Sequence, residues 1–136
     1  MKFYVFLIAL LGLVFAEEQV KSIPREEIVL RCEECLIPNP AARKYFVKIL
    51  DFKYPDVPEV DSHMDCVAEK LGLWDLKTGQ FNVERLAAFF SVDPNNAEDM
   101  DIIQNCVVKP QEEEVHVRRG YLCILNSRLG DNVLRA

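Results

Sequence analysis

The sequence predicts an all-α domain of six short helices joined by disulfides, and three observations support this fold class. Proline, glycine and capping residues divide the chain into short amphipathic stretches, and no stretch alternates apolar and polar residues with the period of two that a strand requires. The 136-residue chain has no internal repeat or low-complexity linker. Five cysteines in so short a chain predict cross-links between the helices.

An apolar run from Phe3 to Phe15 opens the chain and ends at Ala16. The run is too short to cross a bilayer comfortably, so residues 1–16 are predicted to be a signal peptide and residues 17–136 a single secreted, extracellular domain. A membrane anchor is the alternative, but polar sequence follows at once. The net charge of −6 makes nucleic acid a poor partner, and no later apolar run predicts a membrane contact after cleavage.

Proline residues open the first two predicted helices. The stretch after Pro24 predicts a helix that ends near Leu36. Asn39 and Pro40 supply a cap and a first-turn residue for a second helix over residues 41–50. This second helix carries apolar residues at the spacing of one helical face, namely Tyr45, Phe46, Ile49 and Leu50.

Four further helices follow a connector with two prolines, and each has a boundary signal. Gly72 ends the third helix, because glycine best tolerates the left-handed conformation after a helix. Asn82 caps the fourth. Asp93 and Pro94 repeat the device of a cap followed by proline, and Pro110 ends the fifth helix. The predicted ranges are residues 59–71, 83–91, 94–108 and 112–129.

The cysteine spacing limits the disulfide pattern. Because five is an odd number, at least one thiol stays free or pairs between chains. A Cys32–Cys66 bond would close a loop of roughly 35 residues, worth about 3 to 4 kcal/mol, and a Cys106–Cys123 bond would join the last two helices. Cys35 can compete for Cys66, link two chains or stay buried, and we favour a buried or free thiol. The spacing fits no metal site, so no metal or cofactor is expected.

Two segments and the cysteine pattern carry a resemblance to a known family. Residues 60–75 and 77–89 resemble the insect odorant-binding protein superfamily of pheromone-binding and general odorant-binding proteins. With Cys66 as the third cysteine of that family and Cys123 as the last, Ser62 and Glu114 stand where the family has two cysteines that pair with each other. The resemblance therefore implies six helices around an apolar cavity, the pairs Cys32–Cys66 and Cys106–Cys123, and loss of the third family disulfide.

Within that superfamily, the same segments are similar to the salivary D-seven proteins of blood-feeding flies, which sequester small host mediators. The resemblance implies a secreted carrier, not an enzyme, that binds an eicosanoid-like lipid or an odorant in an internal cavity. One alternative is a carrier in chemosensory lymph that delivers odorants to receptors. Another is a protein–protein inhibitor of the anticoagulant type, which would use the acidic run Glu112–Glu114. The sequence does not predict an oligomeric state.

A cavity for a hydrophobic ligand requires apolar and aromatic walls with a few polar anchors. Phe89 and Phe90 point about 100° apart on a helix, so we expect at most one to face a ligand. Tyr54 and Tyr121 offer hydroxyl groups, and Trp74 can cover the mouth of the cavity or pack as a wedge. The candidate ligand-binding residues are Phe46, Leu50, Phe52, Tyr54, Val67, Leu71, Trp74, Phe81, Leu86, Phe89, Phe90, Ile103, Tyr121, Leu122 and Leu125.

Charged side chains offer fewer candidates. Arg43, Lys44 and Arg85 can pair with an acidic lipid head group, although solvated surface charge is the more common role. His63 and His116 can act as pH switches because imidazole titrates near neutrality, but ordinary surface histidines are more common. Neither histidine completes a catalytic or metal-binding set at usable spacing.

Overall fold

The computed structural model describes residues 22–107 and 116–134, in which seven α-helices and one 3-10 helix confirm the predicted all-α class. The only strands in this part of the chain are two residues long and form a small hairpin. The predicted signal peptide and the run Glu112–Glu114 lie outside the described residues. No helix in the described ranges has the length and apolar character needed to cross a membrane.

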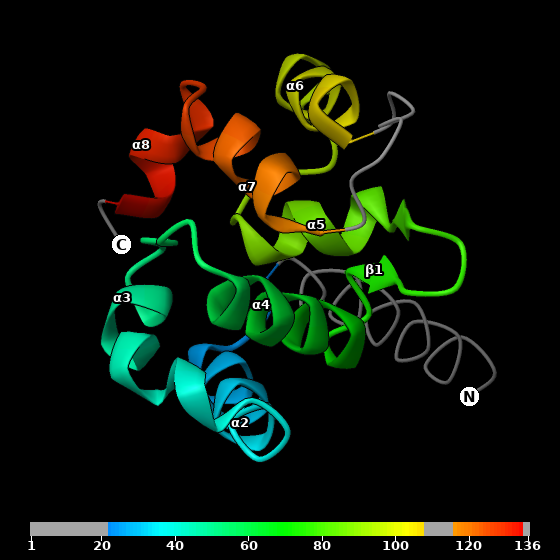
Figure 1. Ribbon diagram of the computed structural model, residues 1–136. Helices are drawn as coiled ribbons and strands as arrows, with labels where there is room; N and C mark the ends of the chain where they lie inside the picture. The colour runs from blue at the N-terminus through cyan, green and yellow to red at the C-terminus, as the bar shows by residue number, and fades with distance from the viewer. Residues whose placement is uncertain (1–21, 108–115, 135–136) are drawn as a thin grey trace, which may run out of the picture.

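Helix α4 occupies the centre of the fold (Figure 1) and contacts α2, η1, β1 and α7. Helices α5, α6, α7 and α8 contact one another in chain order. The elements are α2 (Arg25–Glu34), η1 (Pro40–Tyr45), α3 (Phe46–Leu50), α4 (Pro58–Lys70), β1 (Trp74–Asp75), β2 (Gln80–Phe81), α5 (Val83–Phe89), α6 (Ala97–Val107), α7 (Arg118–Leu125) and α8 (Leu129–Leu134).

Several predicted boundaries differ from the observed ones. The second predicted helix is divided into η1 and α3, and the sixth into α7 and α8. Asn39 precedes η1, but its side chain donates to the Cys35 carbonyl and does not cap the helix it was predicted to start. Helix α6 begins three residues after Pro94, where the Asn96 side chain accepts from the amide of Asp99. Asn82 caps α5 as predicted.

Helices α3, α4 and α5 end in the same backbone motif, in which one residue adopts the left-handed conformation. Gly72 has φ 74° after α4, as the sequence predicts. The other two positions are not glycine: Phe52 has φ 60° after α3, and Ser91 has φ 56° after α5. In each motif the next residue donates to a carbonyl five positions back, as from Lys53 to Lys48 at 2.8 Å. The motif after α3 turns the connector, residues 51–57, back toward the core.

Helix α4 buries a continuous apolar stripe that includes one histidine. Val60, Met64, Val67 and Ala68 are buried at helical spacing, and His63 lies among them with no exposed surface. The expectation of a surface position for His63 is therefore wrong. The reason is its spacing, since His63 stands three residues after Val60 and four before Val67, on the face that packs into the core.

A disulfide joins α4 to the end of α2, but it uses Cys35, and Cys32 is a free buried thiol. This corrects the predicted Cys32–Cys66 pair and the predicted free Cys35. The two helices contact each other at two levels that are one turn apart. Cys35 is level with Cys66, and three residues earlier on both helices the Cys32 carbonyl contacts His63. Cys32 thus lies one turn too early to reach Cys66.

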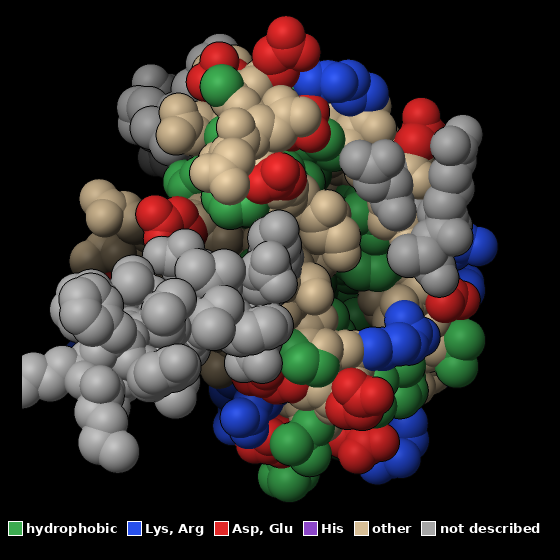
Figure 2. Space-filling model, turned by 180° about the vertical axis from the view of Figure 1, so that it is seen from behind, with side chains coloured by type: hydrophobic (Ala, Val, Ile, Leu, Met, Phe, Trp, Pro, Cys, Tyr) green, Lys and Arg blue, Asp and Glu red, His purple; other side chains and the backbone are tan. Residues whose placement is uncertain are grey.

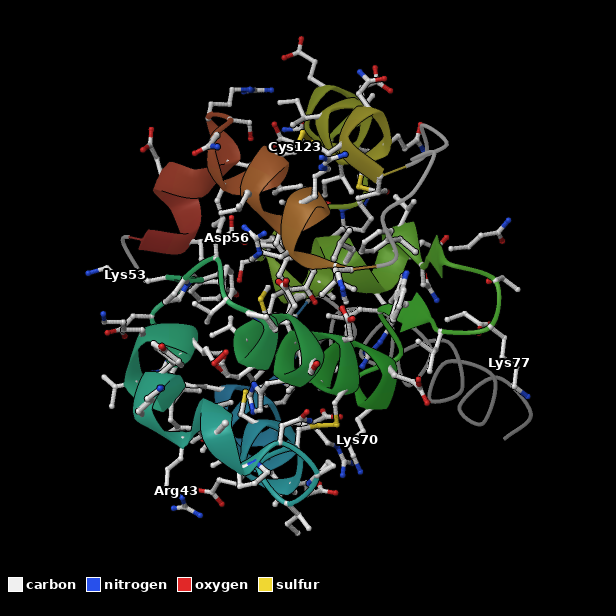
Figure 3. All side chains as sticks on the ribbon, in the orientation of Figure 1. Arg43, Lys53, Asp56, Lys70, Lys77 and Cys123 are labelled. Carbon is white, nitrogen blue, oxygen red and sulfur yellow. A yellow bond between two sulfur atoms is a disulfide. The ribbon has the colours of Figure 1, made fainter. Side chains whose placement is uncertain are left out.

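A second disulfide, Cys106–Cys123, joins α6 to α7, whose labelled Cys123 is seen in Figure 3. This is the other pair that the sequence predicts. Gly120, inside α7, allows the helix to approach the hairpin closely: an added Cβ would lie 3.1 Å from the ring of Phe81 and 3.2 Å from Val107. The disulfide and this close approach together fix α7 against its neighbours.

We expect removal of the Cys35–Cys66 bond to destabilise the fold strongly and removal of Cys32 to do so only slightly. Cys35→Ala with Cys66→Ala opens a loop between residues 31 positions apart, which corresponds to about 3 to 4 kcal/mol of unfolding free energy. Cys32→Ala is expected to lose about 1 kcal/mol through a small cavity. Urea unfolding followed by circular dichroism measures both.

A thiol count under denaturing, non-reducing conditions supplies the control. The wild type should give one reactive thiol per chain and Cys32→Ala none, because Cys32 is the free cysteine. A reactive thiol that persists in Cys32→Ala would show that the chain uses another pairing.

The left-handed residues after α3 and α5 should respond oppositely to glycine. Ser91 is exposed, so Ser91→Gly relieves backbone strain without loss of packing and should stabilise the protein by about 0.5 to 1 kcal/mol. Phe52→Gly also relieves strain but removes a ring that packs on Phe89 and Phe90, so it should destabilise. Thermal unfolding of the two variants measures the contrast, and a stabilised Phe52→Gly would contradict it.

Candidate functional site

A small apolar cavity lies between helices α2, α3, α4, α5 and α7 and the connector, residues 51–57. Its volume is about 20 Å³, which is room for about one water molecule. A hydrophobic ligand therefore requires the walls to move apart. The residues that line the cavity are Ile28, Cys32, Ile49, Leu50, Phe52, Tyr54, Met64, Val67, Phe89 and Tyr121.

Aromatic rings fill most of the interior beside the cavity. Phe89 is central, with ring centroids 5.6 Å from Phe52, 5.0 Å from Phe90 and 5.5 Å from Tyr121. The ring of Tyr54 lies 5.8 Å from Tyr121. Most of these pairs are edge-on or tilted, the arrangements that aromatic quadrupoles favour. Phe89 lines the cavity and its neighbour Phe90 does not, as expected from their angular separation.

One side of the cavity carries weakly acidic groups. Burial raises the pKa of Tyr54 far above its ordinary range, and the nearby Cys32 adds to the rise. Burial also raises the pKa of Tyr121, with further contributions from Tyr54, Asp65 and Cys32. The two tyrosines and the cysteine line the same small cavity. No hydrogen bond joins either hydroxyl to another described residue, and neither is among the polar atoms that are both fully buried and without a partner.

Cys32 is the third member of this group and is only 2 % exposed. Burial raises the pKa of its thiol to about 12, and the charge of Glu33 adds to the rise. A thiol with such a pKa is neutral and a poor nucleophile at physiological pH. Cys32 therefore contributes a small, weakly polar surface to the cavity.

His63 stands behind Cys32 and fixes its backbone. Its Nε2 lies 2.8 Å from the Cys32 carbonyl oxygen, and because that oxygen only accepts, Nε2 carries the proton. Its Nδ1 is buried and has no hydrogen-bond partner in the described structure. Burial lowers the pKa of His63, while the bond to Cys32 opposes that shift. The histidine is thus neutral in the fold and satisfies a carbonyl at the end of α2.

Two carboxylates on α4 hold the start of α7 in place, and α7 carries Tyr121. Asp65 accepts from the Val117 amide at 2.9 Å and from Nδ1 of His116 at 2.6 Å. One turn earlier, Asp61 accepts from Nε of Arg118 at 2.7 Å. A carboxylate at the start of a helix favours its dipole. Burial nevertheless raises the pKa of Asp65, so the cost of its desolvation exceeds the gain from these partners.

The structure brings together six of the predicted ligand-binding residues in the cavity, and their contact with a ligand remains a prediction. They are Leu50, Phe52, Tyr54, Val67, Phe89 and Tyr121. Trp74 and Phe81 line a separate open groove of about 600 Å³ beside the hairpin, so Trp74 does not cover the mouth of the cavity. The remaining candidates line neither site and are Phe46, Leu71, Leu86, Phe90, Ile103, Leu122 and Leu125.

Four lining residues were missed, and the sequence contains a signal for most of them. Ile28 and Cys32 are four residues apart on α2 and share a face. Met64 stands three residues before Val67 on the buried stripe of α4. Ile49 is part of the predicted stripe of the second helix. Cys32 alone was not predicted to line the cavity as a free thiol, because the sequence predicted that it forms a disulfide.

The predicted charged anchors do not reach the cavity. Arg85 donates to the Leu71 carbonyl at the end of α4, at 2.8 Å from Nη2. Lys44 lies over the ring of Tyr45. Arg43 is exposed at the edge of the molecule in Figure 3. No group of His, Cys, Asp and Glu in the described ranges is placed to hold a metal ion.

Comparison with known proteins gives one match. The sequence model of the PBP/GOBP family matches residues 17–127, which is most of the chain. No curated protein and no solved structure gives a significant match.

We expect the buried His63 to make the fold labile to mild acid. In the unfolded chain His63 binds a proton near pH 6.5, whereas the folded state resists protonation because its pKa is lowered. The contribution of neutral His63 to the free energy of unfolding is therefore complete above pH 6.5. It is lost as the pH falls toward the lowered pKa, and the free energy of unfolding then decreases by at most about 1.4 kcal/mol per pH unit. Urea unfolding at pH 7.5 and 5.5 measures this loss.

Two matched variants identify the histidine responsible. His63→Gln retains a donor for the Cys32 carbonyl but does not titrate, so its stability should change less between the two pH values. His116→Gln removes the exposed histidine and should keep the acid lability of the wild type. If His63→Gln lost stability as steeply as the wild type, His63 would not be the source.

Proposed function

Because the chain belongs to the PBP/GOBP family, whose members are binding proteins for small hydrophobic ligands, we propose that it is a secreted carrier that encloses such a ligand among its helices. The observation that supports this most is the apolar cavity, which is lined from five helices and the connector. The ligand classes to be considered are odorants and eicosanoid-like lipids. Capture is stoichiometric and involves no bond chemistry.

Ligand entry requires the cavity to widen, and the connector is the wall best suited to move. Phe52 and Tyr54 are only partly buried, whereas Met64 on α4 is 2 % exposed and Tyr121 on α7 is 3 % exposed. Phe52 also holds a left-handed backbone conformation that is unfavourable for an aromatic residue. Outward movement of its ring opens the aromatic cluster. Burial of apolar ligand surface, at about 25 cal/mol per Å², then offsets the loss of ring contacts.

Two biological settings use the same capture. In saliva, a carrier of this kind would remove a host mediator, and this setting follows from the similarity of residues 60–75 and 77–89 to the D-seven proteins. In chemosensory lymph, the carrier would deliver an odorant to a receptor. Transcript abundance in salivary gland against antenna separates the two. The inhibitor alternative has less support: the face seen in Figure 2 mixes acidic, basic and apolar side chains in small groups.

Displacement of a neutral fluorescent probe tests the proposal. Among odorants, fatty alcohols and eicosanoids, at least one compound should bind with micromolar affinity. Val67→Phe fills the cavity and should weaken binding at least about tenfold, at a stability loss of about 1 to 3 kcal/mol that circular dichroism monitors.

Leu76→Phe is the matched control, since Leu76 lines the outer groove beside the hairpin and is 55 % exposed. It should bind the probe as the wild type does. If Leu76→Phe weakened binding while Val67→Phe did not, the outer groove would be the ligand site. The absence of any binder in all three classes would overturn the proposed function.

A further inference from the structure

The cavity wall contains hydrogen-bond donors but no charge. All ten residues that line it are uncharged side chains, and three of them carry a protic group: Cys32, Tyr54 and Tyr121. No hydrogen bond joins the hydroxyl of Tyr54 or Tyr121 to another described residue, and neither hydroxyl is among the fully buried polar atoms that lack a partner, although the Tyr121 residue as a whole is only 3 % exposed. Because both residues line the cavity, their hydroxyls can donate hydrogen bonds to a ligand oxygen that enters it.

The surroundings of the cavity disfavour a negative charge. The labelled cations Arg43, Lys53 and Lys77 lie at the periphery of the molecule in Figure 3. Lys70 is exposed and pairs with Glu34. Arg118, which starts the helix that carries Tyr121, is engaged by Asp56 and Asp61. Burial raises the pKa of Tyr121, and the carboxylate of Asp65 adds to the rise, so its negative charge acts on the tyrosine pair. A ligand carboxylate would therefore be desolvated without a counter-ion and repelled by Asp65.

We infer that the cavity selects an uncharged ligand with a carbonyl or hydroxyl oxygen, which accepts a hydrogen bond from Tyr121 and Tyr54, and that it rejects carboxylates. This inference rests on the proposed function and narrows it, since it favours neutral volatile molecules over acidic lipids. The apolar part of the ligand lies against Val67 and Phe89, and its oxygen lies at the tyrosine pair.

Matched ligands test the charge rule. Methyl decanoate and decanoate differ in one methyl group and one charge, and the ester should bind at least about tenfold more tightly at pH 7.4. Affinity is measured by probe displacement. Equal binding of the ester and the carboxylate would overturn the inference while leaving the proposed function intact.

A second pair tests the hydrogen bond. Tyr121→Phe should weaken binding of 2-decanone about three- to tenfold, as expected for the loss of one hydrogen bond, and leave binding of decane unchanged. Tyr54→Phe should show the same difference between the ketone and the alkane, and it replaces Tyr121→Phe in the test if that variant does not fold. Tyr45→Phe is the control, since Tyr45 lies outside the cavity. An equal effect of Tyr121→Phe on the ketone and the alkane would contradict the role of the hydroxyl.

Cys32 gives an independent readout of where the ligand binds. Because its thiol lines the cavity, a bound ketone should slow its reaction with the neutral reagent 4,4′-dithiodipyridine. Protection of Cys32 by 2-decanone but not by decanoate supports the inference, and protection by both contradicts it. If no compound bound the protein or protected Cys32, the proposed function itself would fail, and the inference with it.

Discussion

The register between α2 and α4 is the constraint on which the rest of the structure depends. The Cys35–Cys66 bond fixes one level of the contact, and the hydrogen bond from His63 to the Cys32 carbonyl fixes the level one turn earlier. Two attachments one turn apart prevent α2 from both rotating and sliding. As a result, Ile28 and Cys32 face the interior and complete the cavity wall. A slide of one turn would bring Cys32 to Cys66 and remove the thiol from the cavity.

The opposite wall is held by charge and by a second covalent bond. Asp61 and Asp65 on α4 accept hydrogen bonds from the start of α7, and the Cys106–Cys123 bond holds the second half of α7 against α6. Tyr121 is therefore fixed between two attached points. Against these rigid walls stands the connector, whose path depends on the left-handed Phe52 and on ring contacts. The fold thus combines a fixed frame with one wall held mainly by packing, as a site that must open requires.

Local sequence signals predicted the fold class well, and tertiary contacts set the remainder. Gly72 and Asn82 mark helix ends because their residue types suit those positions. Phe52 and Ser91 occupy the same left-handed position as Gly72, but no local preference reveals this, since packing elsewhere holds them there. His63 lies on the buried apolar stripe of α4. Its spacing from Val60 and Val67 indicates this position, whereas its polar residue type suggests a surface position.

The candidate site shows the same division between local and tertiary information. Aromatic content and helical spacing predicted six of the lining residues, including both tyrosines. The choice between Cys32 and Cys35 could not be made from spacing, because either residue lies within one turn of the other and the helix register decides the pairing. The small size of the cavity was likewise inaccessible, since it depends on how five rings pack against one another.

The hydrogen-bond donors in the cavity wall do not change their protonation with pH in the physiological range. Burial raises the pKa values of Cys32, Tyr54 and Tyr121, so all three groups stay protonated across the physiological range. The donors offered to a ligand therefore do not change with pH. His63 makes no direct contribution to the wall, but its neutral form holds the end of α2 that carries Cys32. A loss of ligand in mild acid would consequently report loosening of the α2–α4 register and not titration of the binding groups themselves.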